Sequence, residues 1–283
     1  MKFILFFYLL VCSVCYGQIV IEGNAPSYKN KYISLLTFDD YVTYTYKNLA
    51  KQKIDSTGKF KFEINTDKAF KTILEIEEKS SILYIDPATK NYKIHFPSFQ
   101  EGEQTMSENN IKLIFEDLPK DDLNTLILEF NYRFDDFLYG DTLSMMRLVR
   151  QDKEFKDSLD IFKNELLTHY EQINNEYFHN YIRYSIGAVE QLSTGNQIAL
   201  NRINVFNHYI KDRPVLYDND AYMTFFNQFY ENILKSPVKG GKDRLYIAIN
   251  NNSSKVLLDE IFSEDVFLQD PKIREMTMIK GLA

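Results

Sequence analysis

The sequence contains no tryptophan and only two cysteines among its 283 residues. The cysteines are Cys12 and Cys15, a C-x-x-C spacing that is typical of thiol-disulfide exchange. Both lie in the N-terminal segment MKFILFFYLLVCSVCYG, in which Lys2 precedes an apolar run that ends in small residues. That order is typical of a secretory signal peptide, and the run is too short to span a membrane as a helix. We therefore expect cleavage after Gly17, which would remove both thiols with residues 1–17.

The absence of cysteine from residue 18 onward excludes several classes of protein. Without a thiol there is no disulfide, no cysteine nucleophile and no redox pair, so an extracytoplasmic chain of this kind needs a large hydrophobic core. The net charge is −7, and no run of basic residues offsets it, so we expect no nucleic-acid partner. No later hydrophobic stretch reaches membrane-spanning length, and we expect no transmembrane anchor.

The common catalytic and metal-binding motifs are also missing. The sequence has no H-E-x-x-H, G-x-S-x-G, P-loop or G-x-G-x-x-G motif. The histidines lack metal-ligand spacing, so we interpret them as surface or packing residues: His95, His169, His179 and His208. We interpret Asp39-Asp40 as part of a loop and Asp135-Asp136 as a solvated edge. The sequence therefore predicts no catalytic residue, no cofactor and no metal site, although it does not exclude catalysis centred on a serine.

Apolar and polar residues alternate from residue 18 to residue 97, as they do in strands with one buried face. We expect strands near residues 19–21, 33–37, 60–64, 73–76, 82–85 and 92–96, and 111–115 is a candidate for another. Turn-forming groups such as Asp55-Ser56-Thr57-Gly58 separate them. The pattern predicts an antiparallel β-sandwich domain over residues 18–97, followed by a polar, aperiodic linker over residues 98–110.

From about residue 120 the apolar spacing changes to that of amphipathic helices. One helix is expected over 123–138, and a second begins at Phe155 with an apolar spacing that continues to Leu192. Further helices are expected at 198–210, after Asp218-Asn219-Asp220, near 254–263 and from Pro271. Residues 111–283 are therefore predicted to form an all-α helical domain, which makes the fold α+β and multidomain.

The high tyrosine content is the most unusual feature of the composition, with 20 tyrosines in the chain. Tyr177, Tyr181 and Tyr184 fall near one face of an expected helix, with Arg183 beside them. One interpretation is an aromatic groove that stacks on sugar rings or grips a peptide, with these four residues as ligand contacts. The other is an amphipathic helical core that uses tyrosine where one end of the side chain meets water. The sequence leaves both interpretations open.

Six segments resemble parts of a known family. IEGNAPSYKNKYISL, DSTGKFKF and LYIDP are similar to the N-terminal sandwich domain of extracytoplasmic thioredoxin-like thiol-disulfide oxidoreductases of Gram-negative bacteria. FHNYIRYSIGAVE, VLYDNDAYMTFFNQFY and IREMTMIKG look like the helical middle region of the same proteins. The resemblance implies a periplasmic location. In that family the redox work belongs to a C-terminal thioredoxin domain with W-C-x-x-C, so no catalytic residue carries over to this sequence.

Two classes of function follow. The first is a non-catalytic accessory or recognition protein, or the truncated non-redox part of such an oxidoreductase, with a peptide, a glycan or a thioredoxin-fold domain as partner. The second is a periplasmic hydrolase or carbohydrate-handling enzyme on a sandwich-plus-helix frame. The second requires carboxylates or histidines with strongly perturbed pKa values in a cleft, and the first predicts none.

Overall fold

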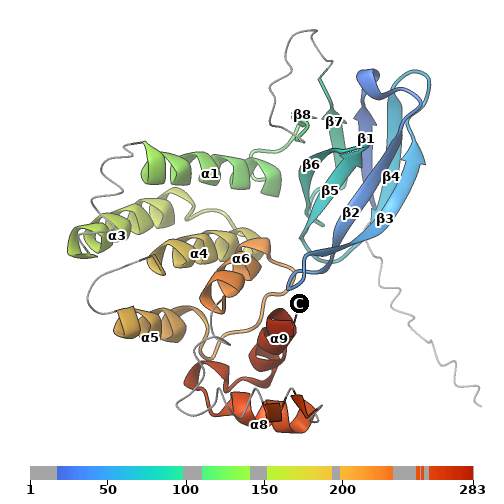
Figure 1. The fold of residues 1–283 in the computed structure, drawn as a ribbon. Coiled ribbons are helices and arrows are strands. Elements are labelled where there is room, and N and C mark those ends of the chain that lie inside the picture. The colour runs from blue at the N-terminus through green and yellow to red at the C-terminus, as the bar shows by residue number, and fades with distance from the viewer. Residues whose placement is uncertain are drawn as a thin grey trace, which may run out of the picture.

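The computed structural model describes residues 18–97, 110–140, 152–192, 198–231, 247–248, 250–251 and 255–282. The expected signal peptide, residues 1–17, and residues 98–109 of the expected linker lie outside the described residues. A β-sandwich stands on one side of the molecule and the helices gather on the other (Figure 1). The predicted α+β class is confirmed, since strands form the N-terminal part and helices form the remainder. None of the described helices is long and apolar enough to cross a membrane.

The strands form two four-stranded sheets with the orders β4-β1-β7-β8 and β3-β2-β5-β6. The strands are β1 (Gln18–Asn24), β2 (Tyr32–Asp40), β3 (Thr45–Lys53), β4 (Lys59–Asn65), β5 (Phe70–Ile76), β6 (Lys79–Ile85), β7 (Asn91–His95) and β8 (Ile114–Glu116). The paired strands are antiparallel except β1 and β7, which run parallel. Alternation along a strand does not reveal the direction of its neighbour, so the sequence could not show this parallel pair.

The inward-facing side chains of the two sheets form the core of the sandwich. Ile21 of β1 is fully buried opposite Phe62 of β4, as the alternation of period two requires. Two residues further along, Gly23 lies opposite Phe60. The Phe60 ring occupies the space beside Gly23, because a Cβ atom built there would lie 2.0 Å from Phe60 Cζ. Glycine at this position therefore lets an aromatic ring close the end of the core.

Strand β3 was not expected from the sequence. It lies at the edge of its sheet, and most of its side chains are exposed. An edge strand that buries little surface needs no apolar alternation, and its segment TYKNLAKQK shows none. The pairing with β2 also shifts register between Leu35 and Leu36, so β3 carries a bulge that would blur any pattern.

The sandwich continues beyond the expected linker. Strand β8 pairs with β7. The Ile111 N–H donates to the Ser80 carbonyl oxygen at 2.7 Å, and the Ser81 hydroxyl donates to the Ile111 carbonyl oxygen. The β-structure therefore includes residues on both sides of residues 98–109.

The helices are α1 (Leu123–Tyr139), α3 (Asp152–His169), α4 (Glu176–Glu190), α5 (Ile198–Tyr209), α6 (Asp220–Phe229), α8 (Lys255–Ser263) and α9 (Pro271–Leu282). The expectation of one helix from Phe155 to Leu192 was wrong, because α3 ends at His169 and α4 begins after Asn175. The Asn175 side chain accepts a hydrogen bond from the Phe178 N–H, which starts a new helix. The apolar residues keep a helical spacing across the break between α3 and α4, so the sequence pattern did not show where one helix ends.

The sandwich and the helices share a buried junction. Tyr41 and Val42, in the turn after β2, are buried in a cluster with residues of α5, α6 and α9. At β6, the Asn124 side chain of α1 accepts from the Tyr84 N–H and donates to the Tyr84 carbonyl oxygen, both at 2.8 Å. Side chains from the sandwich thus complete the helical core.

Candidate functional site

Three of the residues predicted as ligand contacts lie on α4 and have different surroundings. Tyr184 is 1% exposed, and its hydroxyl donates to the Tyr209 carbonyl oxygen at 3.2 Å. The Tyr181 hydroxyl donates to the Asn131 side chain, also at 3.2 Å. Arg183 is exposed to solvent on another side of α4. Both phenol rings pack against other residues of the core.

The fourth predicted contact, Tyr177, belongs to the junction. Its hydroxyl donates to Asp220 at 3.0 Å, Tyr84 donates to the same carboxylate at 2.9 Å, and Lys71 Nζ lies 3.1 Å from it. Burial, and then the charge of Asp220, raise the pKa values of Tyr177 and Tyr84 well above the usual range. Both phenols therefore remain neutral donors, and this cluster joins the sandwich to the helices.

The two carboxylate pairs singled out in the sequence lie in different settings. Asp39 and Asp40 end β2, rather than lying in the loop expected from the sequence. Asp40 caps the turn after β2 by accepting from the Val42 and Thr43 N–H groups. Burial of the Asp40 carboxyl opposes ionisation, but hydrogen bonds from Thr43 and Tyr217 outweigh it and lower the pKa. Asp135 and Asp136 are exposed on α1.

Two histidines are likewise engaged by neighbouring groups. His169 Nε2 lies 2.7 Å from Glu129 Oε1, and His179 Nε2 lies 2.6 Å from the Ile173 carbonyl oxygen. Within the described ranges, no group of three histidine, aspartate or glutamate side chains could hold a metal ion.

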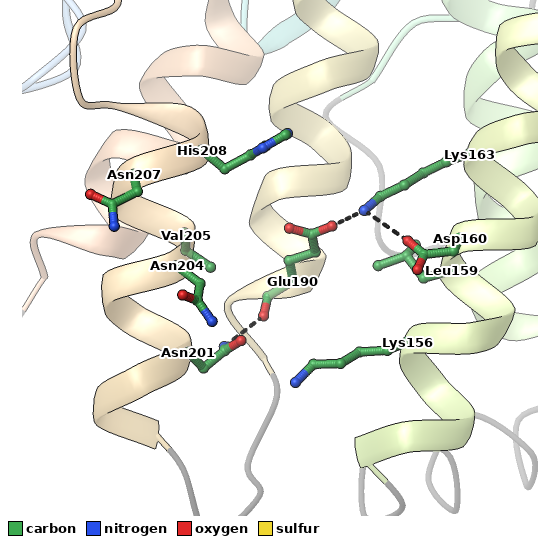
Figure 2. A pocket seen from close by; sticks show the side chains of 10 residues that line it. All are labelled: Lys156, Leu159, Asp160, Lys163, Glu190, Asn201, Asn204, Val205, Asn207 and His208. Carbon is green, nitrogen blue, oxygen red and sulfur yellow. Dashed lines mark hydrogen bonds and ion pairs between the residues drawn. The ribbon is translucent and has the colours of Figure 1, made fainter.

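A polar cleft between α3, α4 and α5 is the best candidate for a binding site (Figure 2). Its volume is about 560 Å³, which is within the range usual for small-ligand sites. Its described lining comprises Lys156, Leu159, Asp160, Lys163, Glu190, Asn201, Asn204, Val205, Asn207 and His208. The cleft shares none of the four residues predicted as contacts.

Two helical faces form the walls of the cleft. Lys156, Leu159, Asp160 and Lys163 follow the spacing i, i+3, i+4, i+7 along α3, which places them on one face. Asn201, Asn204, Val205 and His208 repeat this spacing along α5. Leu159 and Val205 are buried, with 1% and 3% exposure, so each wall has one apolar residue at its base.

The wall contributed by α3 carries paired charges. Lys163 Nζ donates to Glu190 Oε1 of α4 and lies 3.4 Å from Asp160 Oδ1. The side chains of Lys163 and Glu190 are only 27% and 22% exposed. Burial, and then the charge of Glu190, raise the pKa of Tyr209 far above its ordinary value, so that phenol is neutral beside the cleft. The Lys163 ammonium group thus engages both carboxylates of the described lining.

The opposite wall carries amides. Asn201 Nδ2 donates to the Glu190 backbone carbonyl oxygen at 3.1 Å, which fixes α5 against the end of α4. Asn204 is exposed on the same face and points toward the space beside Glu190 (Figure 2). A carboxamide offers both a donor and an acceptor, so this wall can bind neutral polar groups of either kind.

The carboxylates of the cleft are engaged by an ammonium group rather than standing alone. General acid catalysis needs a carboxyl whose pKa is raised or a base aimed at a substrate, and nucleophilic catalysis needs an activated hydroxyl or amine. In this cleft the carboxylates are bonded to Lys163. The other polar groups of the described lining are amides, Lys156 and His208.

The sequence did not predict this cleft, because its described lining contains neither a catalytic motif nor an aromatic cluster. The polar faces of α3 and α5 can be recognised from their spacing after the fact. Their opposition across a cavity depends on the break between α3 and α4, which the sequence did not show. No family model matches the chain, and no curated protein matches it.

Proposed function

We propose that this protein is a non-catalytic recognition protein of the extracytoplasmic space that binds a neutral polar ligand between α3, α4 and α5. The observation that carries the proposal is the cleft itself. Asparagine side chains of α5 face the charged side chains of α3 and α4, in which Lys163 contacts Asp160 and Glu190. The described lining contains two lysines and two carboxylates, so its formal charges cancel when His208 is neutral. Such a lining provides hydrogen bonds without selecting strongly for either sign of ligand charge.

The proposal extends to location and family. The signal-like segment at residues 1–17 supports export, and the resemblance of six segments supports placement in the periplasm of a Gram-negative bacterium. By the same resemblance, the chain would be an accessory relative of thioredoxin-like thiol-disulfide oxidoreductases, or the non-redox part of one. A sandwich followed by helices is the fold that this resemblance implies.

A hydrolase or carbohydrate-handling enzyme has less support. That function requires an acid or base directed at a substrate. Glu190 and Asp160 are the cleft carboxylates in the described residues, and both contact Lys163.

One experiment separates recognition from turnover. The purified protein is incubated with pooled neutral peptides and oligosaccharides, the retained compounds are identified by mass spectrometry, and the remaining pool is examined for products. We expect retention of unchanged compounds, with weaker retention by Asn204→Ala. Products whose formation is lost in Glu190→Gln would establish an enzyme instead, and the absence of both retention and products would refute a recognition function for the cleft.

A further inference from the structure

The amide wall of α5 indicates the class of ligand more closely, and this step rests on the proposed recognition function. We infer that the cleft binds a short segment of peptide in an extended conformation, held through its backbone by Asn201 and Asn204. The inference depends on the spacing of the polar groups along α5, on the chemistry of the two amides and on the other side chains that line the cleft.

The spacing suits an extended chain. A helix rises about 1.5 Å per residue, so the seven steps from Asn201 to His208 cover roughly 10.5 Å. Three residues of an extended peptide cover about 10 Å, because each adds about 3.3 Å. The polar groups that α5 presents to the cleft therefore extend along about three peptide units. His208 lies at one end of this row, and Lys156 lies across from the other (Figure 2).

The chemistry of the amides matches that of a peptide group. A peptide unit presents one N–H donor and one carbonyl acceptor, and an asparagine side chain can satisfy both at once. Asn201 uses one of its two Nδ2 hydrogens on the Glu190 carbonyl, and a carboxamide has a second hydrogen and an acceptor oxygen in addition. That bond also restricts the orientation of the Asn201 amide, which reduces the entropy lost on binding.

The remaining lining disfavours the main competing ligand. Aromatic side chains provide the flat apolar faces on which sugar rings stack. The described lining of the cleft contains no phenylalanine or tyrosine, and His208 supplies its single ring.

The test uses the full protein and three defined probes. These are a library of capped hexapeptides of glycine, alanine, serine, threonine and valine, the same library with every backbone nitrogen methylated, and a set of neutral hexasaccharides. Retention is measured by mass spectrometry and affinity by calorimetry. We expect the unmodified peptides to bind, and N-methylation to abolish binding because it removes the backbone donors. Asn204→Ala should weaken binding by about tenfold.

The matched control is Asn164→Ala, which changes an exposed asparagine of α3 that does not line the cleft. It should leave affinity unchanged, and both variants should retain the parent thermal midpoint to within a few degrees. Binding of hexasaccharides in place of peptides would overturn the peptide inference and leave the recognition function standing. Equal binding of the N-methylated library, or equal affinity of Asn204→Ala, would overturn recognition of the backbone by α5. Failure of both peptides and oligosaccharides to bind would overturn the proposed function as well.

Discussion

The Tyr84 hydroxyl donates a 2.9 Å hydrogen bond to the Asp220 carboxylate, although the two residues are 136 positions apart in the chain. Tyr84 lies in β6, and Asp220 opens α6. The same carboxylate accepts from Tyr177 and pairs with Lys71. This carboxylate, which is partly buried, therefore links a strand of the sandwich to two helices.

Asp220→Asn should destabilise the protein by about 3 kcal/mol. The substitution preserves the shape of the side chain but leaves the Lys71 ammonium group, 19% exposed, without its countercharge. Denaturant unfolding measures the change in the free energy of unfolding. The control is Asp218→Asn, whose carboxylate is 57% exposed and lies 3.6 Å from Lys68, and it should change stability by less than about 0.5 kcal/mol. Equal effects of the two variants would show that the Asp220 carboxylate does not stabilise the junction between the sandwich and the helices.

Gly23→Ala should destabilise the sandwich by about 2 kcal/mol, because the new methyl group would overlap the Phe60 ring. Adding Phe60→Leu should recover part of this loss, since the smaller side chain leaves room for the methyl group. A thermodynamic cycle of the two single variants and the double variant measures this coupling. Additive effects of the two changes would contradict direct contact between these positions.

Stability should fall in alkaline solution as buried tyrosines ionise. Burial, and then the charge of Asp220, raise the pKa of Tyr181 to about 12. A raised folded-state pKa contributes stability that is complete below the unfolded value of about 10 and is lost as pH rises toward 12. Tyr181→Phe should therefore flatten the decline of the unfolding free energy between these values. An unchanged decline in Tyr181→Phe would contradict a raised pKa at this phenol.

Cleavage of the chain within residues 98–109 should leave two fragments that remain associated. Tyr41 and Val42 would have to leave the helical cluster, and Tyr84 would have to leave Asp220, before the fragments could separate. A protease site introduced into this segment, followed by size-exclusion chromatography, tests the expectation. Co-elution in native buffer and separation in denaturant support a shared core. Separate elution in native buffer would instead indicate two independent domains.

The spacing of apolar residues in the sequence determined those strands and helices that bury one face along their whole length. Ile21 opposite Phe62, and the buried series Leu126, Phe130 and Leu138, follow the periods of strand and helix directly. Capping residues also set several helix starts, as Asp270 does by accepting from the Lys272 and Ile273 N–H groups ahead of α9. These features are local, since they depend on residues a few positions apart.

The tertiary structure decided the features that depend on distant partners. Strand β3 exists because β2 supplies its hydrogen bonds, although its own sequence has no buried face. The tyrosines of α4 could have lined a groove or filled a core, and the surrounding helices and β6 bury Tyr184 and cover Tyr177 and Tyr181 in part. The cleft arises only where the polar faces of α3 and α5 meet across α4. Periodicity gives the direction of a face along its own element, but the packing of other elements decides what that face meets.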